Sequence, residues 1–183
     1  MFFFERYFHT VVKYDLINTF FYQNLTEVPK LEKIVLNFGY KNPNFKHIIS
    51  SLLALEFISF EKGNITKSKD LNVFLKIKKG NPVGCKITLR KKTMYFFYLK
   101  LINFILSETK QSQKSQLRWN LELDKSISFQ LKNPLLFTEL ENHFQFFKNI
   151  SQLDITLNTN SICQKELIFI FRSIKLFIKI EDY

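Results

Sequence analysis

The chain is short of the small residues from which nucleotide-binding loops are built. Its 183 residues include four glycines and a single alanine, Ala54, and neither common type of glycine-rich phosphate loop is present. A nucleotide-binding fold is therefore disfavoured. The histidines His9, His47 and His143 are scattered, with no Ser-His-Asp order suited to nucleophilic catalysis and no HExxH motif. We expect a protein that is not an enzyme and that uses no cofactor.

Cysteine is equally scarce. Cys85 and Cys163 have no CxxC partner and no histidine at metal-ligand spacing, so we expect no metal site. Because free cysteine is among the most frequently buried residue types, we expect both to be small buried side chains.

Long apolar runs are missing too. The most apolar run, Met94–Leu106, is interrupted by Lys100 and Asn103 and is shorter than the roughly 20 residues that a bilayer requires, so we expect no membrane insertion. Its apolar residues recur at helical spacing, which predicts a helix either sandwiched inside the domain or covered by a partner. The N-terminal MFFFERYFHT has the features of neither a transit peptide nor a signal peptide.

Positive charge is abundant. The net charge of +11 and the isoelectric point near 9.6 favour a polyanionic partner, nucleic acid before an anionic membrane surface. Ten basic residues lie between Lys62 and Lys92, against the single acid Asp70. Such lysines also form ordinary solvated surfaces in proteins from A+T-rich genomes, but their clustering around one loop favours nucleic acid.

Phenylalanine, lysine, isoleucine and asparagine together make up 79 of the 183 residues. This usage is typical of A+T-rich codons and favours an organellar gene. The 22 phenylalanines have two interpretations: replacement of leucine in the core, which packing tolerates, or contact with neighbouring proteins. For the N-terminal Phe2-Phe3-Phe4 we expect the second, because no core element surrounds it.

The most informative stretch is Phe74–Arg90, where two β-patterned runs flank a lysine-rich turn. Glycine tolerates positive φ and proline fixes its own, so Gly80 and Pro82 predict the turn. In the outgoing run, apolar Ile87 and Leu89 alternate with polar residues, which predicts a strand with one face on a core and the other cationic. The polar residues are Lys86, Thr88 and Arg90. A lysine-studded hairpin loop is suited to binding phosphate and indicates RNA recognition.

Alternating helical and strand patterns predict an α+β fold, a largely antiparallel sheet with helices packed on one face and a protruding basic hairpin loop. We expect one RNA-binding domain over residues 14–183 and an N-terminal extension over residues 1–13. The expected strands are 31–38, 65–67, 83–90, 126–131 and 153–159. The expected helices are 14–22, 45–57, 94–106, 137–147 and 164–177, with a polar loop at 107–114. Leu140, Phe144 and Phe147 would face inward, and the open sheet face would carry Asn37, Thr88, Arg90 and Thr156.

Four blocks occur in one order along nearly the whole chain: EVPKLEKIVLNFG (27–39), ITK (65–67), KIKKGNPVGCKITLR (76–90) and LDITLNT (153–159). Together they resemble the universal large-subunit ribosomal protein family called L-five, which binds 5S rRNA. The resemblance implies a structural role in the central protuberance of the large subunit. It implies as partners large-subunit rRNA, 5S rRNA where present, P-site tRNA, a small-subunit head protein across a bridge, and neighbouring central-protuberance proteins.

The resemblance also implies which residues bind. The rRNA contacts on the sheet face and beside it would be Asn37, Lys67, Lys86, Thr88 and Arg90. The tRNA-facing loop would present Lys76, Lys78, Lys79 and Asn81. Asn and Thr make directional hydrogen bonds to sugar and phosphate, whereas flexible lysines supply charge.

Two departures from the family pattern bear on the partner. Phe60-Glu61 stands where family members usually carry Gly-Gln, and a carboxylate facing phosphate weakens binding. The Arg/Gly-rich segment after the long helix is replaced by a shorter glycine-free segment at 107–125. Both departures suit a mitochondrial ribosome with reduced or replaced 5S rRNA better than a plastid one. The alternative from a different class is a basic peripheral-membrane or protein-interaction module without RNA binding.

Overall fold

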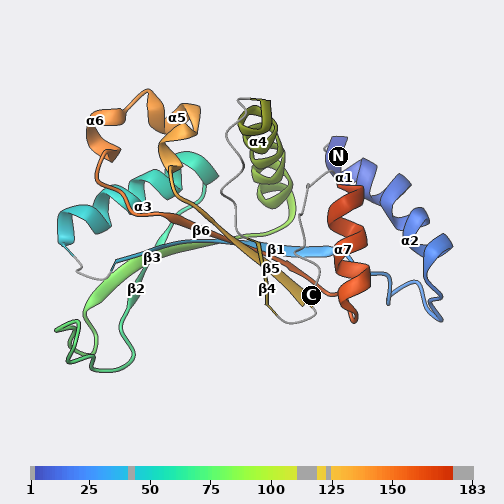
Figure 1. The fold of residues 1–183 in the computed structure, drawn as a ribbon, viewed down its shortest axis with the longest axis horizontal. Helices are drawn as coiled ribbons and strands as arrows, with labels where there is room; N and C mark the ends of the chain where they lie inside the picture. Colours follow the sequence, from blue (N-terminus) through green and yellow to red (C-terminus); the bar gives the residue numbers. More distant parts are fainter. Residues whose placement is uncertain (1–2, 41–43, 111–118, 123–124, 175–183) are drawn as a thin grey trace. The chain divides into compact units, whose positions relative to one another are not determined.

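The computed structural model describes residues 3–40, 44–110, 119–122 and 125–174, and it confirms the predicted α+β class. Six strands form one sheet in the order β2-β3-β1-β6-β5-β4 (Figure 1), in which β2 pairs antiparallel with β3 and β4 with β5. The strands are β1 (Leu31–Gly39), β2 (Asn64–Lys67), β3 (Pro82–Leu89), β4 (Trp119–Glu122), β5 (Ser126–Leu131) and β6 (Leu153–Thr159). The helices are α1 (Phe3–Tyr7), η1 (Phe8–Val12), α2 (Lys13–Thr19), α3 (Phe45–Ser59), α4 (Lys91–Lys110), η3 (Pro134–Leu136), α5 (Thr138–Glu141), α6 (Phe144–Phe147) and α7 (Gln164–Ser173).

The chain divides into two compact units. Unit 1 comprises Met1–Ile34, Arg90–Phe129 and Thr156–Tyr183, and unit 2 comprises Val35–Leu89 and Gln130–Ile155. Strands β1, β5 and β6 each contribute residues to both units.

All five predicted strands form, each within one residue of its predicted ends, and β4 is an addition that no pattern indicated. Helix α3 extends two residues past its predicted end, and α4 extends beyond the predicted run at both ends. Residues 107–110, expected in a loop, belong to α4, while 111–114 lie outside the described residues. The helix predicted to run to residue 177 ends at Ser173, and residues 175–177 lie outside the described part as well.

The helix predicted over 137–147 is instead two single turns, α5 and α6. The break falls at Asn142 and His143, and it redirects the second turn. Leu140 and Phe147 are buried as predicted, but Phe144 is exposed, so its inward assignment was wrong.

In unit 1, the N-terminal segment is part of the core. Phe4, Phe8, Val12 and Leu16 recur every four residues along α1, η1 and α2, and all are buried. In an α-helix of 3.6 residues per turn, side chains four residues apart shift gradually around the helix axis. The π-helical turn at Phe8–Val12, which has more residues per turn, compensates for that shift.

The ring of Phe4 packs on α4, with its centroid 4.7 Å from that of Tyr98 and 5.9 Å from that of Tyr95. The expectation that the N-terminal phenylalanines dock on neighbouring proteins is therefore wrong for Phe4. The side chains of Phe2 and Phe3 lie outside the described residues. Helix α4 buries its own Met94, Tyr95, Phe97, Tyr98 and Leu101 within the chain.

In unit 2, α3, α5 and α6 lie on the same side of the strands (Figure 1). Helix α3 packs against β3, where the Cys85 Sγ lies 2.9 Å from the Ser51 Oγ and donates to the Ile48 carbonyl at 3.2 Å. The ring of Phe57 on α3 contacts those of His143 and Phe147, at centroid distances of 5.6 and 5.9 Å. One face of the strands in this unit is therefore covered by helices.

Strand β3 approaches β1 at a position with no room for a side chain. The Tyr40 N–H donates to the Val83 carbonyl at 3.0 Å, and a Cβ added to Gly84 would lie 2.2 Å from the Phe38 carbonyl oxygen. That oxygen belongs to the backbone, so it cannot move aside without disturbing the strand pair.

Replacing Gly84 with alanine should therefore lower the free energy of unfolding by about 2–3 kcal/mol, the cost of forcing atoms into a packed site. Chemical denaturation monitored by circular dichroism measures the change. The matched control is Gly39→Ala, because a Cβ there would meet nothing closer than the Asn37 Nδ2 at 4.0 Å. Equal stability of the two variants would contradict the steric argument.

Helix α3 ends without glycine. Phe60 follows its last turn in the left-handed region, at φ 57° and ψ 22°, and its N–H donates to the Glu56 carbonyl at 2.9 Å. This is the position at which helices usually place glycine, since a Cβ in that region costs about 1–2 kcal/mol. The side chain is 66% exposed.

We predict that Phe60→Gly raises the free energy of unfolding by about 1 kcal/mol through relief of this strain. Thermal unfolding compared with wild type measures the effect. Leu53→Gly, at an exposed site within α3, should have the opposite sign, since glycine in a helix interior costs about 1 kcal/mol. Destabilisation by both variants would refute the strain at Phe60.

The two cysteines differ in their surroundings. Cys85 is buried, as predicted, and burial raises the pKa of its thiol, while the hydrogen bond to Ser51 acts in the opposite direction. Cys163 is exposed, so the prediction that it is buried was wrong. It lies at the N-cap of α7, where its N–H donates to the Glu166 carboxylate at 3.4 Å in a capping box.

We expect a disulfide reagent at mildly alkaline pH to modify one thiol of the folded chain rapidly and the second only on unfolding, because reaction requires an accessible thiolate. Absorbance of the released thiol follows both phases. Cys163→Ser should remove the fast phase, whereas Cys85→Ser should leave it. Two equally fast thiols in the native chain would contradict the burial of Cys85.

Candidate nucleic-acid interface

The candidate interface in unit 2 begins with the outward side of β3. Along this strand, Cys85, Ile87 and Leu89 are buried, whereas Lys86 and Thr88 are exposed. Because the Cys85 side chain contacts α3, the buried residues face the helices and the alternating polar ones face the other side. The predicted alternation of Lys86 and Thr88 with the core residues is confirmed.

The neighbouring strands add polar groups to the same side. In β1, Asn37 is half-buried between the fully buried Leu36 and Phe38, and its side chain therefore lies opposite to theirs. In β2, Asn64 pairs with Lys86 and Thr66 with Gly84. Paired residues of antiparallel strands present their side chains on one face, so Asn64 and Thr66 join this surface. We call it the open face: Asn37, Asn64, Thr66, Lys86 and Thr88.

Two residues assigned to rRNA contact lie outside the open face. Lys67 is exposed at the end of β2, where the register with β3 shifts, and so stands at the base of the following loop. Arg90 directly follows β3 and is exposed, but it belongs to unit 1, and its carbonyl accepts a hydrogen bond from the Thr93 Oγ1 at 2.8 Å at the start of α4. Sequence periodicity places Arg90 in line with Lys86 and Thr88, but it does not reveal this change of unit.

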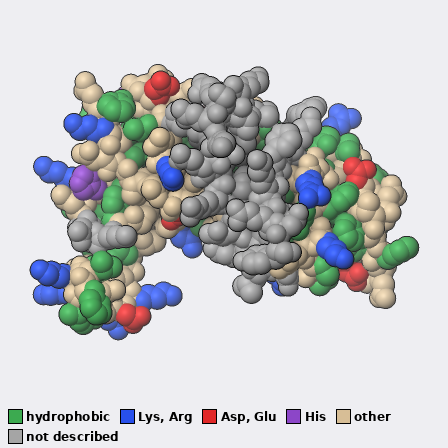
Figure 2. All heavy atoms as spheres, viewed as in Figure 1, with side chains coloured by type: hydrophobic (Ala, Val, Ile, Leu, Met, Phe, Trp, Pro, Cys, Tyr) green, Lys and Arg blue, Asp and Glu red, His purple; other side chains and the backbone are tan. Residues whose placement is uncertain are grey.

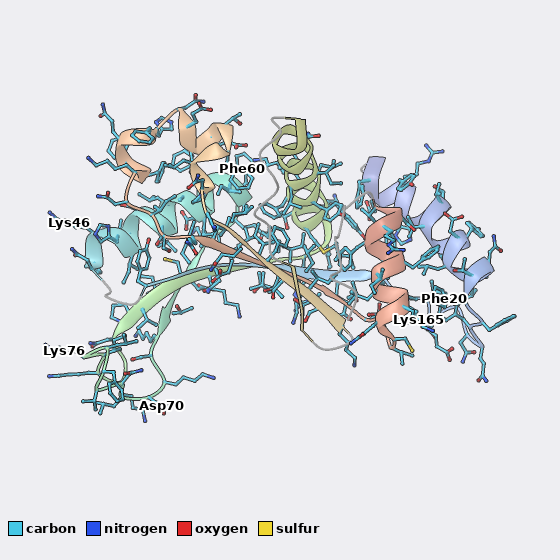
Figure 3. All side chains as sticks on the ribbon, in the orientation of Figure 1. Phe20, Lys46, Phe60, Asp70, Lys76 and Lys165 are labelled. Atoms are coloured by element: carbon cyan, nitrogen blue, oxygen red, sulfur yellow. The ribbon has the colours of Figure 1, made fainter. Side chains whose placement is uncertain are left out.

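The loop between β2 and β3, residues 68–81, is the second part of the interface; Figure 3 labels Asp70 and Lys76 on it. Its base is closed by Ser68, whose N–H donates to the Asn81 carbonyl at 2.9 Å and whose Oγ donates to the Lys78 carbonyl at 2.6 Å. The Gly80 N–H donates back to the Ser68 carbonyl at 3.0 Å.

A tight turn over Lys78–Asn81 completes the base of the loop, with the Asn81 N–H donating to the Lys78 carbonyl at 3.2 Å. Gly80 occupies it at φ 86°, which confirms the turn predicted there; Pro82 begins β3 instead. The incoming run from Phe74, predicted to have a β pattern, forms no strand: only the isolated bridge between Asn72 and Ile77 is present.

The loop presents cations to solvent. Lys69, Lys76, Lys78 and Lys79 are exposed, as is Asn81, while Ile77 is buried and anchors the segment. Lys76 adopts φ 53°, a left-handed conformation that reverses the chain next to Val73. The structure thus brings the four residues assigned to the tRNA-facing loop onto one short segment.

Two features of this region were not predicted from the sequence. The first is the contribution of Asn64 and Thr66 to the open face, which their position in a short strand opposite Lys86 could have indicated. The second is apolar exposure within the basic loop, where Leu71, Val73 and Phe74 face solvent beside the lysines (Figure 2). The sequence pattern assigns Phe74 to a strand run, and nothing in that local pattern separates a strand residue from a loop-tip residue.

Candidate metal sites and membrane-spanning helices are missing from the residues that the structure describes. No group of three or more His, Cys, Asp or Glu side chains among them could hold a metal ion, and none of their helices has the length and apolarity needed to cross a bilayer. What the region presents is a hydrogen-bonding sheet face and a cationic loop, and these groups suit an extended anionic polymer.

Comparison with known proteins places the chain in a family. The model for the C-terminus of the ribosomal L5 family matches residues 82–176. Large ribosomal subunit protein uL5m of Reclinomonas americana is 30% identical over 164 residues, covering 88% of this chain and 90% of the relative. The uL5 proteins of Wigglesworthia glossinidia brevipalpis and of Clostridium botulinum strain Hall are each 35% identical, over 153 and 168 residues, covering 82% and 88% of this chain and 84% and 89% of the relatives. The family match, the curated relatives and the α+β fold agree, and the chain belongs to the ribosomal L5 family.

Proposed function

We propose that this chain is a structural constituent of the large ribosomal subunit and binds rRNA through the open face and the adjoining basic loop. The observation that carries the proposal is the pairing of these two surfaces on β3, in a chain whose relatives are large-subunit proteins. Asn and Thr side chains at fixed positions on a sheet form directional hydrogen bonds with sugar and phosphate groups. The lysines add charge without selecting a sequence.

Within the ribosome, the open face would hold 5S rRNA, or the RNA that replaces it, in the central protuberance. The loop residues Lys76, Lys78, Lys79 and Asn81 would contact P-site tRNA, and a further surface would bridge to a small-subunit head protein. Glu61 supports the idea of a replaced partner. It lies three residues before the start of β2 and is half-buried, and a carboxylate that faces phosphate would repel it.

We assign the protein to the mitochondrial ribosome, with an organelle-encoded gene. The uL5m relative and the A+T-rich residue usage support this location, while the bacterial uL5 relatives fit the bacterial ancestry of organellar ribosomes.

The direct test is to tag the protein, crosslink it in the organelle and sequence the RNA that co-purifies. Large-subunit rRNA together with 5S rRNA and P-site tRNA is the result expected for the full role. Large-subunit rRNA without 5S rRNA would retain the ribosomal assignment and identify a substitute partner for the open face. Absence of any enriched RNA would overturn the proposal.

The loop makes its own prediction. Replacing Lys76, Lys78 and Lys79 with alanine should weaken rRNA binding and lower the slope of log affinity against log salt by about 2–3, since each lysine that neutralises a phosphate contributes about 0.7–0.9. Filter binding across a salt series measures both quantities.

The matched control removes three other exposed lysines of unit 2: Lys46, Lys62 and Lys148. The total charge changes equally, so a local role of the loop predicts a smaller effect in the control. Equal effects of the two triple variants would refute the local role, and circular dichroism verifies that both variants fold.

A further inference from the structure

The tip of the basic loop, residues 71–75, exposes apolar side chains in the middle of a cationic segment. Phe74 is 99% exposed, and Val73 and Leu71 are 73% and 65% exposed. A single exposed apolar side chain is ordinary on a protein surface, but three of them gathered on one loop tip mark a candidate contact surface.

The backbone under this ring is ordered by its own hydrogen bonds. Asn72 and Ile77 exchange backbone bonds of 2.9 and 3.0 Å, and the Lys76 N–H donates to the Val73 carbonyl at 3.1 Å. The Asn72 Oδ1 accepts from the Leu75 N–H at 3.1 Å, which closes a turn around Phe74. The hydrogen-bonded turn thus holds the Phe74 ring in solvent, and the backbone loses little further conformational entropy when a partner binds.

The charge around the ring identifies the kind of partner. Lys69, Lys76, Lys78 and Lys79 are exposed on the same loop, against one acid, Asp70 (Figure 2). An apolar protein pocket would suit the ring but would leave the lysines without counter-charges. A nucleotide satisfies both, because its base offers a stacking surface and its phosphate accepts a lysine.

We infer that Phe74 stacks on an unpaired base of the RNA that the loop binds. The inference rests on the proposed function of the loop and adds to it a contact that depends on the aromatic ring rather than on charge. Bases within a duplex are already stacked on their neighbours, so the contact selects RNA with an accessible base: a loop, a bulge or a strand end.

The test uses the full chain and two RNA probes: a hairpin whose loop carries one unpaired 2-aminopurine, and a perfectly paired duplex of the same length. Stacking on an aromatic ring quenches 2-aminopurine fluorescence. Phe74→Leu should weaken hairpin binding about tenfold and abolish the quenching, while Phe74→Trp should retain both. Duplex binding and the salt slope should not change, because phenylalanine has no charge. The control is Phe21→Leu, a second fully exposed phenylalanine, which belongs to unit 1.

Each outcome is decisive. Wild-type binding and quenching in Phe74→Leu, with the salt slope still lowered in the triple lysine variant, would overturn the stacking contact and leave the proposed RNA role of the loop intact. Absence of RNA binding by the wild-type chain would instead overturn the proposed function. Binding to phosphatidylserine vesicles that is lost in Phe74→Leu, without any effect on the hairpin, would assign the tip to a membrane surface and overturn the inference.

Discussion

The close approach of β3 to β1 at Gly84 is the constraint on which unit 2 depends. Neighbouring strands must come within hydrogen-bonding distance, and here the Phe38 carbonyl oxygen occupies the space of a side chain at residue 84. Strand β3 also carries β2 on its other edge, packs on α3 through Cys85, and leads directly out of the basic loop. A displacement of β3 would therefore move the open face and the base of the loop together.

Among the described residues of unit 2, helices cover one side of the strands, so the two faces of β3 have different roles. The alternating buried residues of β3 pack toward α3, and the exposed residues between them, Lys86 and Thr88, remain available for a partner. This is why the outward positions of Lys86 and Thr88 could be predicted from the sequence: side chains of a strand alternate with period two, and both neighbours of each polar residue are apolar or small. Asn37 followed from the same rule applied to β1.

Features that depend on contacts distant in sequence could not be predicted in this way. Phe4 has the same local sequence pattern whether it packs on Tyr98 or on another protein, and the outcome depends on Tyr98 in α4, more than ninety residues further along the chain. Phe144 fits the helical spacing of its neighbours, but the break before it turns it outward. Cys163 stands at a helix start, where the N-cap position rather than residue type decides exposure.

Phe60 illustrates a different limit. The resemblance in sequence led us to expect Gly-Gln where Phe60-Glu61 stands, and we interpreted this difference through the charge of Glu61. The backbone indicates a second consequence, since Phe60 holds a left-handed conformation that glycine adopts without strain. A sequence shows which residue has changed, whereas the cost of the change depends on a dihedral angle.

The hydrogen bonds of Ser68 have a consequence for the kinetics of assembly. Its N–H, carbonyl and hydroxyl groups all form hydrogen bonds, and these hold the base of the loop over residues 68–81 closed before any partner binds. The conformational entropy of the loop is therefore lost during folding and is not subtracted again from the affinity for a partner. A loop ordered in this way binds its target as a rigid body. Association should then require no slow conformational change, and the affinity should be set mainly by the dissociation rate.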